Sequence, residues 1–193
     1  MSETVVILAG GTVVLAVLYG IRLATRASAG GAAASPEGAE ATDVAGVVAP
    51  PPFIFLGFLA AAALLEAIVP LPIPAFPAAR YVVGALFVVA GFVVIFAAAG
   101  RFHAAGTNIP PSLPATALVV DGIYARTRNP FYLGSTLIYA GLAVAAGSLW
   151  AIVLIVPLLW LINVGVIARE ELYLERKFGE AYRAYKARVR RWV

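Results

Sequence analysis

The stretch FYLGSTLIYAGLAVAAGSLWAIVLIVPLLWLINVGVIA (131–168) decides the fold class. It contains two apolar runs, 131–146 and 149–168, and no charged residue. A helix needs about 20 apolar residues to cross roughly 30 Å of hydrocarbon, so each run comes close to the length of a membrane span. Gly147 and Ser148 separate the runs and suit a tight turn. The stretch therefore predicts an antiparallel hairpin of two membrane helices.

Three further apolar blocks precede this hairpin: 4–23, 53–69 and 80–99. The chain is 62% hydrophobic and 12% charged, whereas soluble domains carry about 25% charged residues. We therefore expect an all-α integral membrane protein with about five transmembrane helices. Arg22 and Arg26 follow the first block and no basic residue precedes it, which favours an uncleaved span over a signal peptide. A four-span protein, with the first block cleaved or peripheral, is the alternative.

The composition changes along the chain divide it into four regions. Residues 1–24 form the first predicted span. Residues 25–52 are rich in Ala, Gly, Pro and acidic residues and predict a flexible linker. Residues 53–99 carry the second and third spans. Residues 100–193 combine a polar segment, the hairpin and a charged helical tail that is interrupted at Gly179.

Charge and rare residues restrict the possible functions. Eight of the fourteen basic residues lie at or after Arg169, and Lys and Arg favour the cytoplasmic side of a membrane. We therefore expect a multi-pass protein whose amphipathic tail and C-terminus face the cytoplasm and contact membrane lipid, not nucleic acid. The chain has no cysteine and one histidine, His103, which excludes thiol chemistry and a metal site built from several histidines.

The motif RNPFYLG (128–134) opens the fourth apolar run. Asn129 is a favoured N-cap residue, and Pro130 suits the first helical position. The unpaired N–H groups at such a helix end attract a carboxylate or a phosphate, and Tyr132 places a hydroxyl in the same turn. The same features also fit an ordinary membrane helix.

Two adjacent acids, Glu170 and Glu171, directly follow the fifth run. Acids at the end of a membrane helix are costly if they face hydrocarbon. Glu170 begins a stripe at spacings of three or four that continues through Leu174, Phe178, Tyr182, Tyr185 and Val189. We expect Glu170 to face inward and Glu171 to lie on the polar side with Glu175. Alternatively, both acids are solvated charges paired with Arg169 or Arg176.

Three segments together carry a family resemblance: AGTNIPP (105–111), LVVDGIYARTRNPFYLG (118–134) and REELYLERKFGEAYRAYKARVRRW (169–192). They resemble the isoprenylcysteine carboxyl methyltransferase family and its relatives among phospholipid methyltransferases. The family pattern is Arg-His-Pro-x-Tyr-x-Gly, then two glutamates and a leucine, then Phe-Gly-x-x-Tyr. Here Asn129 stands where many members have histidine, and it keeps hydrogen bonding but cannot become a cation.

The resemblance implies S-adenosyl-L-methionine as the cofactor. The family's cofactor contacts carry over to Ile109, Leu118, Val119, Tyr124, Asn129, Pro130, Tyr132 and Glu170. We expect Tyr132 and Arg169 to be catalytic. An arginine that eukaryotic members use for the acceptor carboxylate falls near Val166, which cannot serve, and Arg169 is the nearest replacement.

The resemblance also implies methyl transfer to a lipophilic acceptor, without a metal. The carboxylate of a prenylcysteine-like molecule is favoured, because a carboxylate is ionised at pH 7 whereas an amine must first lose a proton. The alternatives are a phospholipid N-methyltransferase, an NADPH-dependent membrane reductase of a sterol-like substrate, and a scaffold without enzyme activity.

The two acids give a testable contrast. Glu170 is expected to pair with the ammonium group of the cofactor, so Glu170→Gln should weaken cofactor binding by about tenfold. Glu171→Gln is expected to change the binding free energy by only a few tenths of a kcal/mol, as for an exposed charge.

Overall fold

The computed structural model describes residues 43–71 and 78–193, so the first predicted span, 4–23, lies outside the described residues. Within the described part the protein is all-α, with no β-strand. In chain order the elements are α2 (Pro51–Ile68), α3 (Ala79–Ala105), the 3₁₀ turn η1 (Gly122–Ala125), α4 (Pro130–Ala146), α5 (Leu149–Val153), α6 (Ile155–Leu161), the π-helix η2 (Ile162–Ile167) and α7 (Ala168–Arg188).

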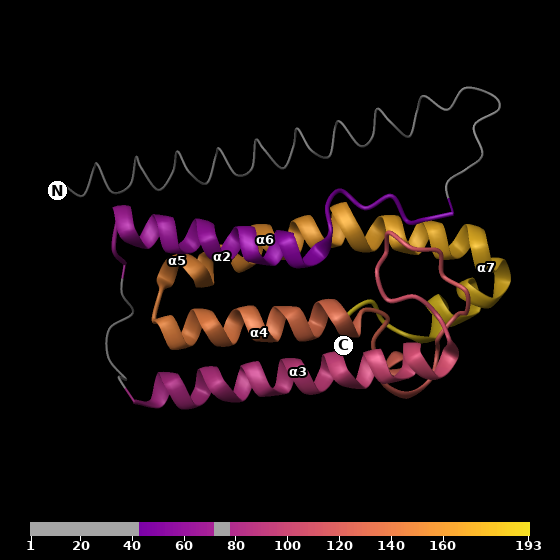
Figure 1. Cartoon of the computed structure of the whole chain (residues 1–193), viewed down its shortest axis with the longest axis horizontal. Helices are drawn as coiled ribbons and strands as arrows, with labels where there is room; N and C mark the ends of the chain where they lie inside the picture. Colours follow the sequence, from indigo (N-terminus) through magenta and orange to yellow (C-terminus); the bar gives the residue numbers. More distant parts are fainter. Residues whose placement is uncertain (1–42, 72–77) are drawn as a thin grey trace, which may run out of the picture.

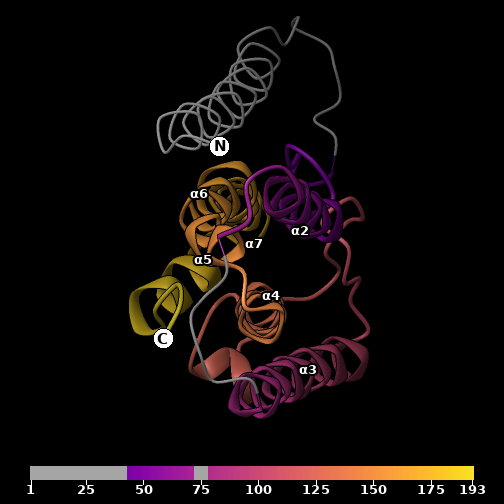
Figure 2. The ribbon, with the colours of Figure 1, turned by 90° about the vertical axis from the view of Figure 1, so that its left-hand side faces the viewer.

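The helices lie alongside one another as a bundle (Figure 1). Seen along the bundle, α4 lies between α3 on one side and α2 with α5 and α6 on the other (Figure 2). Three helical segments are long and apolar enough to cross a membrane: Pro51–Ile68, Ala79–Ala105 and the run Leu149–Arg188. Helix α4 is also apolar but shorter, at 17 residues. These segments confirm a helical membrane protein, and the count of five spans stays a prediction.

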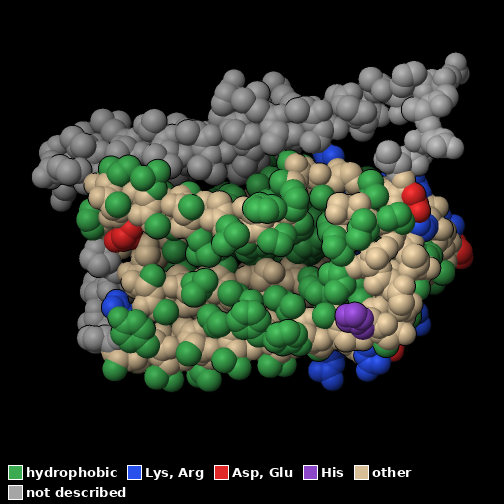
Figure 3. All heavy atoms as spheres, in the orientation of Figure 1, with side chains coloured by type: hydrophobic (Ala, Val, Ile, Leu, Met, Phe, Trp, Pro, Cys, Tyr) green, Lys and Arg blue, Asp and Glu red, His purple; other side chains and the backbone are tan. Residues whose placement is uncertain are grey.

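The surface of the bundle suits hydrocarbon at its centre and water at one end. Large apolar side chains of α3, such as Leu86 and Phe96, are more than half exposed. Lys and Arg side chains gather at the end of the bundle where α3 ends and α7 lies (Figure 3). Arg80 lies at the other end, beside Gly147. This separation is the one that the sequence predicts, and the cytoplasmic orientation of the basic end remains an expectation.

Glycines allow α3 and α4 to pack with their backbones in close contact. Gly91 faces Gly134, and a Cβ atom added to Gly91 would lie 2.5 Å from the Gly134 carbonyl oxygen. Gly84 faces Gly141 in the same way, at 2.6 Å. Small residues that allow such close approach are typical of membrane helix pairs. The sequence carries this signal as a seven-residue glycine spacing on both helices.

The hairpin turn predicted at Gly147 is confirmed, with Gly147 at φ 65° after the end of α4. The predicted fifth span, however, is not one regular helix. It breaks at Leu154 between α5 and α6 and then widens into the π-helix η2. Pro157 explains the break, because proline has no N–H to bond the carbonyl four residues earlier.

Two segments differ from their predicted character. Helix α3 continues past the expected end at residue 99 to Ala105, and the left-handed Gly106 ends it. The apolar block 80–99 therefore predicts the part of α3 that lies in the hydrocarbon of the membrane, whereas the helix itself ends later. Residues 43–50, which belong to the predicted flexible linker 25–52, are held in place: the Val48 N–H donates to the Gly165 carbonyl in η2 at 3.1 Å.

Candidate active site

A cavity of about 420 Å³ lies at the basic end of the bundle. Its walls come from the start of α2 and the segment before it, the end of α3, the connection 107–119, the turn η1, the start of α4 and both parts of α7. This position follows from the fold, because α4 and α7 both begin at this end. The lining is mostly apolar, so the cavity suits a ligand with a large hydrophobic part.

The cavity brings together all eight residues that the resemblance assigns to the cofactor. They are Ile109, Leu118, Val119, Tyr124, Asn129, Pro130, Tyr132 and Glu170. These residues come from three separate stretches of the chain, and only the folded bundle makes them neighbours. Their assignment to a cofactor stays a prediction, and their assembly in one cavity is an observation.

Glu170 and Tyr132 form the polar centre of the cavity. The Tyr132 hydroxyl donates to Glu170 Oε1 at 2.7 Å, which joins the first turn of α4 to the first turn of α7. Among the described residues, Glu170 Oε2 has no hydrogen-bond partner. The Tyr124 hydroxyl is buried and also lacks a partner in the described part of the chain. The cavity thus offers a carboxylate oxygen and a phenol hydroxyl to a ligand.

An aromatic cluster supports one wall of the cavity. The ring of Phe102, from α3, stacks on Tyr124 with centroids 5.2 Å apart, and Phe131 meets Phe102 edge-on at 5.6 Å. The stripe predicted on the tail packs into the same cluster through Leu174, Phe178, Tyr182, Tyr185 and Val189. The prediction that this stripe faces inward is confirmed.

Glu171 corrects the sequence-based expectation. It was expected on the polar side near Glu175, but its side chain is only 6% exposed. Arg128 donates to Glu171 Oε1 at 2.7 Å, and Arg191 donates to Oε2 at 2.6 Å. The reason is tertiary: the chain bends at Gly179 and returns residues 189–192 to the start of α4, which covers this face of α7. Glu175 instead accepts from Lys186 at 3.2 Å.

Asn129 occupies the predicted N-cap position of α4, but its side chain makes no capping hydrogen bond. Its amide instead donates to the Arg191 carbonyl at 2.9 Å. The Asn129 side chain therefore connects the N-terminal end of α4, called here the mouth of α4, to the C-terminal segment. It also lines the cavity.

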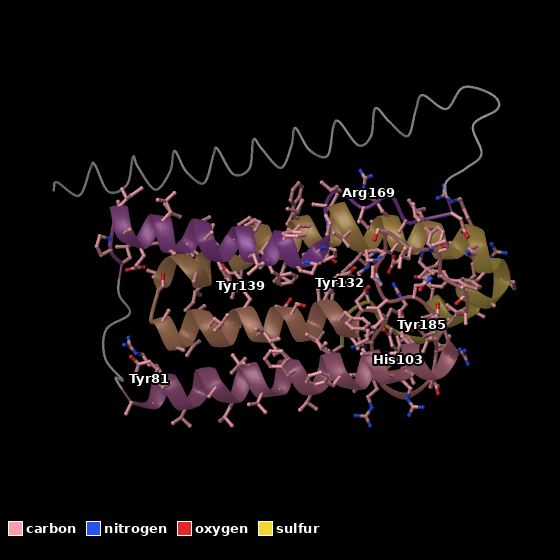
Figure 4. The ribbon with its side chains drawn as sticks, viewed as in Figure 1. Tyr81, His103, Tyr132, Tyr139, Arg169 and Tyr185 are labelled. Carbon is pink, nitrogen blue, oxygen red and sulfur yellow. The ribbon has the colours of Figure 1, made fainter. Side chains whose placement is uncertain are left out.

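Arg169 does not line the cavity. It points away from Tyr132, toward the edge of the molecule (Figure 4), and donates to the Gly46 carbonyl at 3.0 Å. It thereby holds the segment 43–50, as does Lys177, whose hydrogen bond to Asp43 lowers the pKa of that carboxyl. The structure thus brings Tyr132 but not Arg169 to the cavity.

Two other polar side chains, Glu66 and His103, do not line the cavity. Glu66 is at the opposite end of the bundle, where it accepts from the Ser148 hydroxyl at 2.6 Å and the Leu71 N–H at 2.9 Å. His103 is exposed on α3 and does not line the cavity (Figure 4). Within residues 43–71 and 78–193, no group of His, Asp and Glu is arranged to hold a metal ion.

Two parts of the site were not predicted from the sequence. Val47 and Pro50 line the cavity from the predicted linker, where neither periodicity nor a motif marks them. Arg191 reaches the site through Glu171, and in the sequence it is one of many basic residues of the tail. Only the proline run 50–52 gave a signal, as the start of a helix.

Much of the chain that builds the cavity is similar to known proteins. The family model described as phospholipid methyltransferase matches residues 79–181. An uncharacterised protein of Haemophilus influenzae is 44% identical over 62 residues, which are 32% of this chain and 98% of that protein. A protein-S-isoprenylcysteine O-methyltransferase of Schizosaccharomyces pombe is 36% identical over 72 residues, which are 37% of this chain.

This alignment covers only 30% of the length of the Schizosaccharomyces pombe enzyme. No solved structure matches the chain. The family model, in contrast, covers more than half of the chain and includes α3, α4 and most of α7. The predicted resemblance is confirmed: the chain belongs to the phospholipid methyltransferase family.

Proposed function

We propose that this membrane methyltransferase transfers a methyl group from S-adenosyl-L-methionine to a lipophilic acceptor, at a site that faces the cytoplasm. One observation carries the proposal: the motif residues of a methyltransferase family line one cavity, and there one carboxylate oxygen of Glu170 has no partner among the described residues. The family, the cavity and the carboxylate support the same reading.

The residues present fit the cofactor. S-adenosyl-L-methionine supplies a methyl group already activated on a sulfonium. Glu170 would bind the ammonium group of the cofactor, and the Tyr132 hydroxyl holds Glu170 in place. The aromatic wall around Tyr124 suits an adenine base. Because transfer from a sulfonium needs no activated enzyme nucleophile, these side chains contribute by aligning the reactants and excluding water.

The charges that line the cavity bear on the acceptor. Among the described residues, Arg128 is the only Lys or Arg in the lining. It is already bonded to Glu171 and to the Lys186 and Val189 carbonyls. Both terminal nitrogens of Arg128 are thus engaged, and among the described residues only its buried Nε lacks a partner. This arrangement favours an amine or uncharged head group over an acceptor carboxylate and makes phospholipid N-methylation the preferred reaction.

The scarcity of Lys and Arg in the described lining of the cavity also argues against the NADPH-dependent reductase alternative. The 2′-phosphate of NADPH is usually bound by arginine, and both terminal nitrogens of Arg128, the only arginine that lines the cavity among the described residues, already bond other groups. An apolar cavity beside apolar helices also suits an acceptor with a long hydrocarbon tail.

The test is methyl transfer by the purified protein in lipid nanodiscs. Labelled S-adenosyl-L-methionine is supplied with phosphatidylethanolamine, a prenylcysteine or a water-soluble amine. We expect label in a lipophilic product, with the lipid amine preferred over the prenylcysteine. Label in the water-soluble amine alone would contradict a lipophilic acceptor, and preference for the prenylcysteine would contradict the charge argument.

A further inference from the structure

We propose that Arg191 is a positioning residue of the cofactor site, which it serves by withdrawing Glu171 from the ligand. The inference rests on the proposed function. It goes beyond it by giving a role to Arg191, which lies outside the stretch 79–181 that the family model matches. By binding the Glu171 carboxylate, its guanidinium leaves Glu170 as the acid that is available to the ligand.

The geometry around Glu171 supports this role. Arg191 contacts both carboxylate oxygens, with Nε 3.1 Å from Oε1 and Nη2 2.6 Å from Oε2. Such a two-point contact fixes orientation as well as charge. Arg128 takes the remaining position on Oε1 at 2.7 Å. Both oxygens of Glu171 are therefore engaged, although Glu171 itself lines the cavity.

The backbone around Arg191 is held at the mouth of α4. The Arg191 carbonyl accepts from the Asn129 amide at 2.9 Å and from the Thr127 hydroxyl at 3.2 Å. The next residue, Trp192, donates from its indole N–H to the Asn163 side chain in η2 at 3.2 Å. The guanidinium thus arrives from a segment that is fixed at several points.

The arrangement separates two acids that are adjacent in sequence. Within the described part of the chain, one oxygen of Glu170 is left without a partner in the cavity lining, whereas Glu171 is neutralised by Arg128 and Arg191. Without Arg191, Glu171 Oε2 loses its partner and becomes a second anionic site in the same cavity. Glu171 then competes for the ammonium group and pulls the ligand away from Glu170.

The experiment is calorimetry with S-adenosyl-L-homocysteine on the full chain in detergent. Arg191→Gln should weaken binding by about tenfold. Arg191→Lys should have an intermediate effect, because lysine is a point charge without the two-point geometry. The control is Arg188→Gln, whose exposed side chain bonds only its own helix and which should bind within about twofold of wild type.

A double variant separates positioning from a purely structural role. If Glu171 competes for the ligand, Glu171→Gln combined with Arg191→Gln binds more tightly than Arg191→Gln alone. Additive losses, or wild-type affinity in Arg191→Gln, would overturn the proposal. If the wild-type protein bound no cofactor, the proposed function would fail first, and the two failures are therefore distinguishable.

Discussion

Glu171→Gln tests whether buried ion pairs to Arg128 and Arg191 hold Glu171 in place. The Glu171 side chain is 6% exposed and that of Arg128 is 10% exposed. Breaking a buried ion pair costs about 3–5 kcal/mol. Glutamine still accepts one hydrogen bond, and Arg191 is 37% exposed, so its share is reduced by solvent. We expect the free energy of unfolding to fall by about 2–4 kcal/mol.

For a chain of this size, such a loss lowers the melting temperature by about 5–15 °C. The assay is thermal unfolding of the purified protein in detergent, followed by tryptophan fluorescence. Glu175→Gln is the matched control, because it lies one turn further along α7 and its side chain is 31% exposed in its pair with Lys186. A control loss of at most about 1 kcal/mol is expected. If both variants melted at the same temperature, Glu171 would not be held by buried ion pairs.

Three further outcomes are expected. Glu170→Gln should weaken binding of S-adenosyl-L-methionine by about tenfold in calorimetry, with the melting temperature nearly unchanged; equal affinity would remove Glu170 from the site. Gly91→Ala should lower the free energy of unfolding by about 1–3 kcal/mol, because the new Cβ would meet the Gly134 carbonyl. Gly57→Ala, which has open space around it, is its control and should be neutral or slightly stabilising in the same thermal assay. A reporter fused after Val193 should be cytoplasmic, and a signal from the other side of the membrane would reverse the topology.

Local patterns predicted the elements that depend on nearby residues. The hairpin at Gly147 and the bend at Gly179 follow from glycine between helical runs, and both are present. The stripe that runs from Glu170 through Leu174 follows from helical spacing, and its apolar members pack in the cluster that contains Tyr124. The motif at Asn129 and Pro130 correctly placed the start of α4.

The parts that the sequence could not predict depend on distant segments. Helical periodicity shows that Glu171 lies on a different face from Glu170, but it does not show that Arg191 returns to cover that face. In the same way, composition predicts a linker before α2, whereas residues 43–50 bind to α7 and η2. Arg169 was assigned to the site by its sequence position, and that linker segment engages its side chain instead.

We propose that the cavity at the N-terminal end of α4 binds a methyl donor. The decisive experiment is calorimetry of the wild-type protein with S-adenosyl-L-methionine, S-adenosyl-L-homocysteine and NADPH. We predict dissociation constants of about 1 μM to 1 mM for the first two, typical of metabolite affinities, and much weaker binding of NADPH. Tight binding of NADPH without binding of either methyl-donor compound would contradict the account.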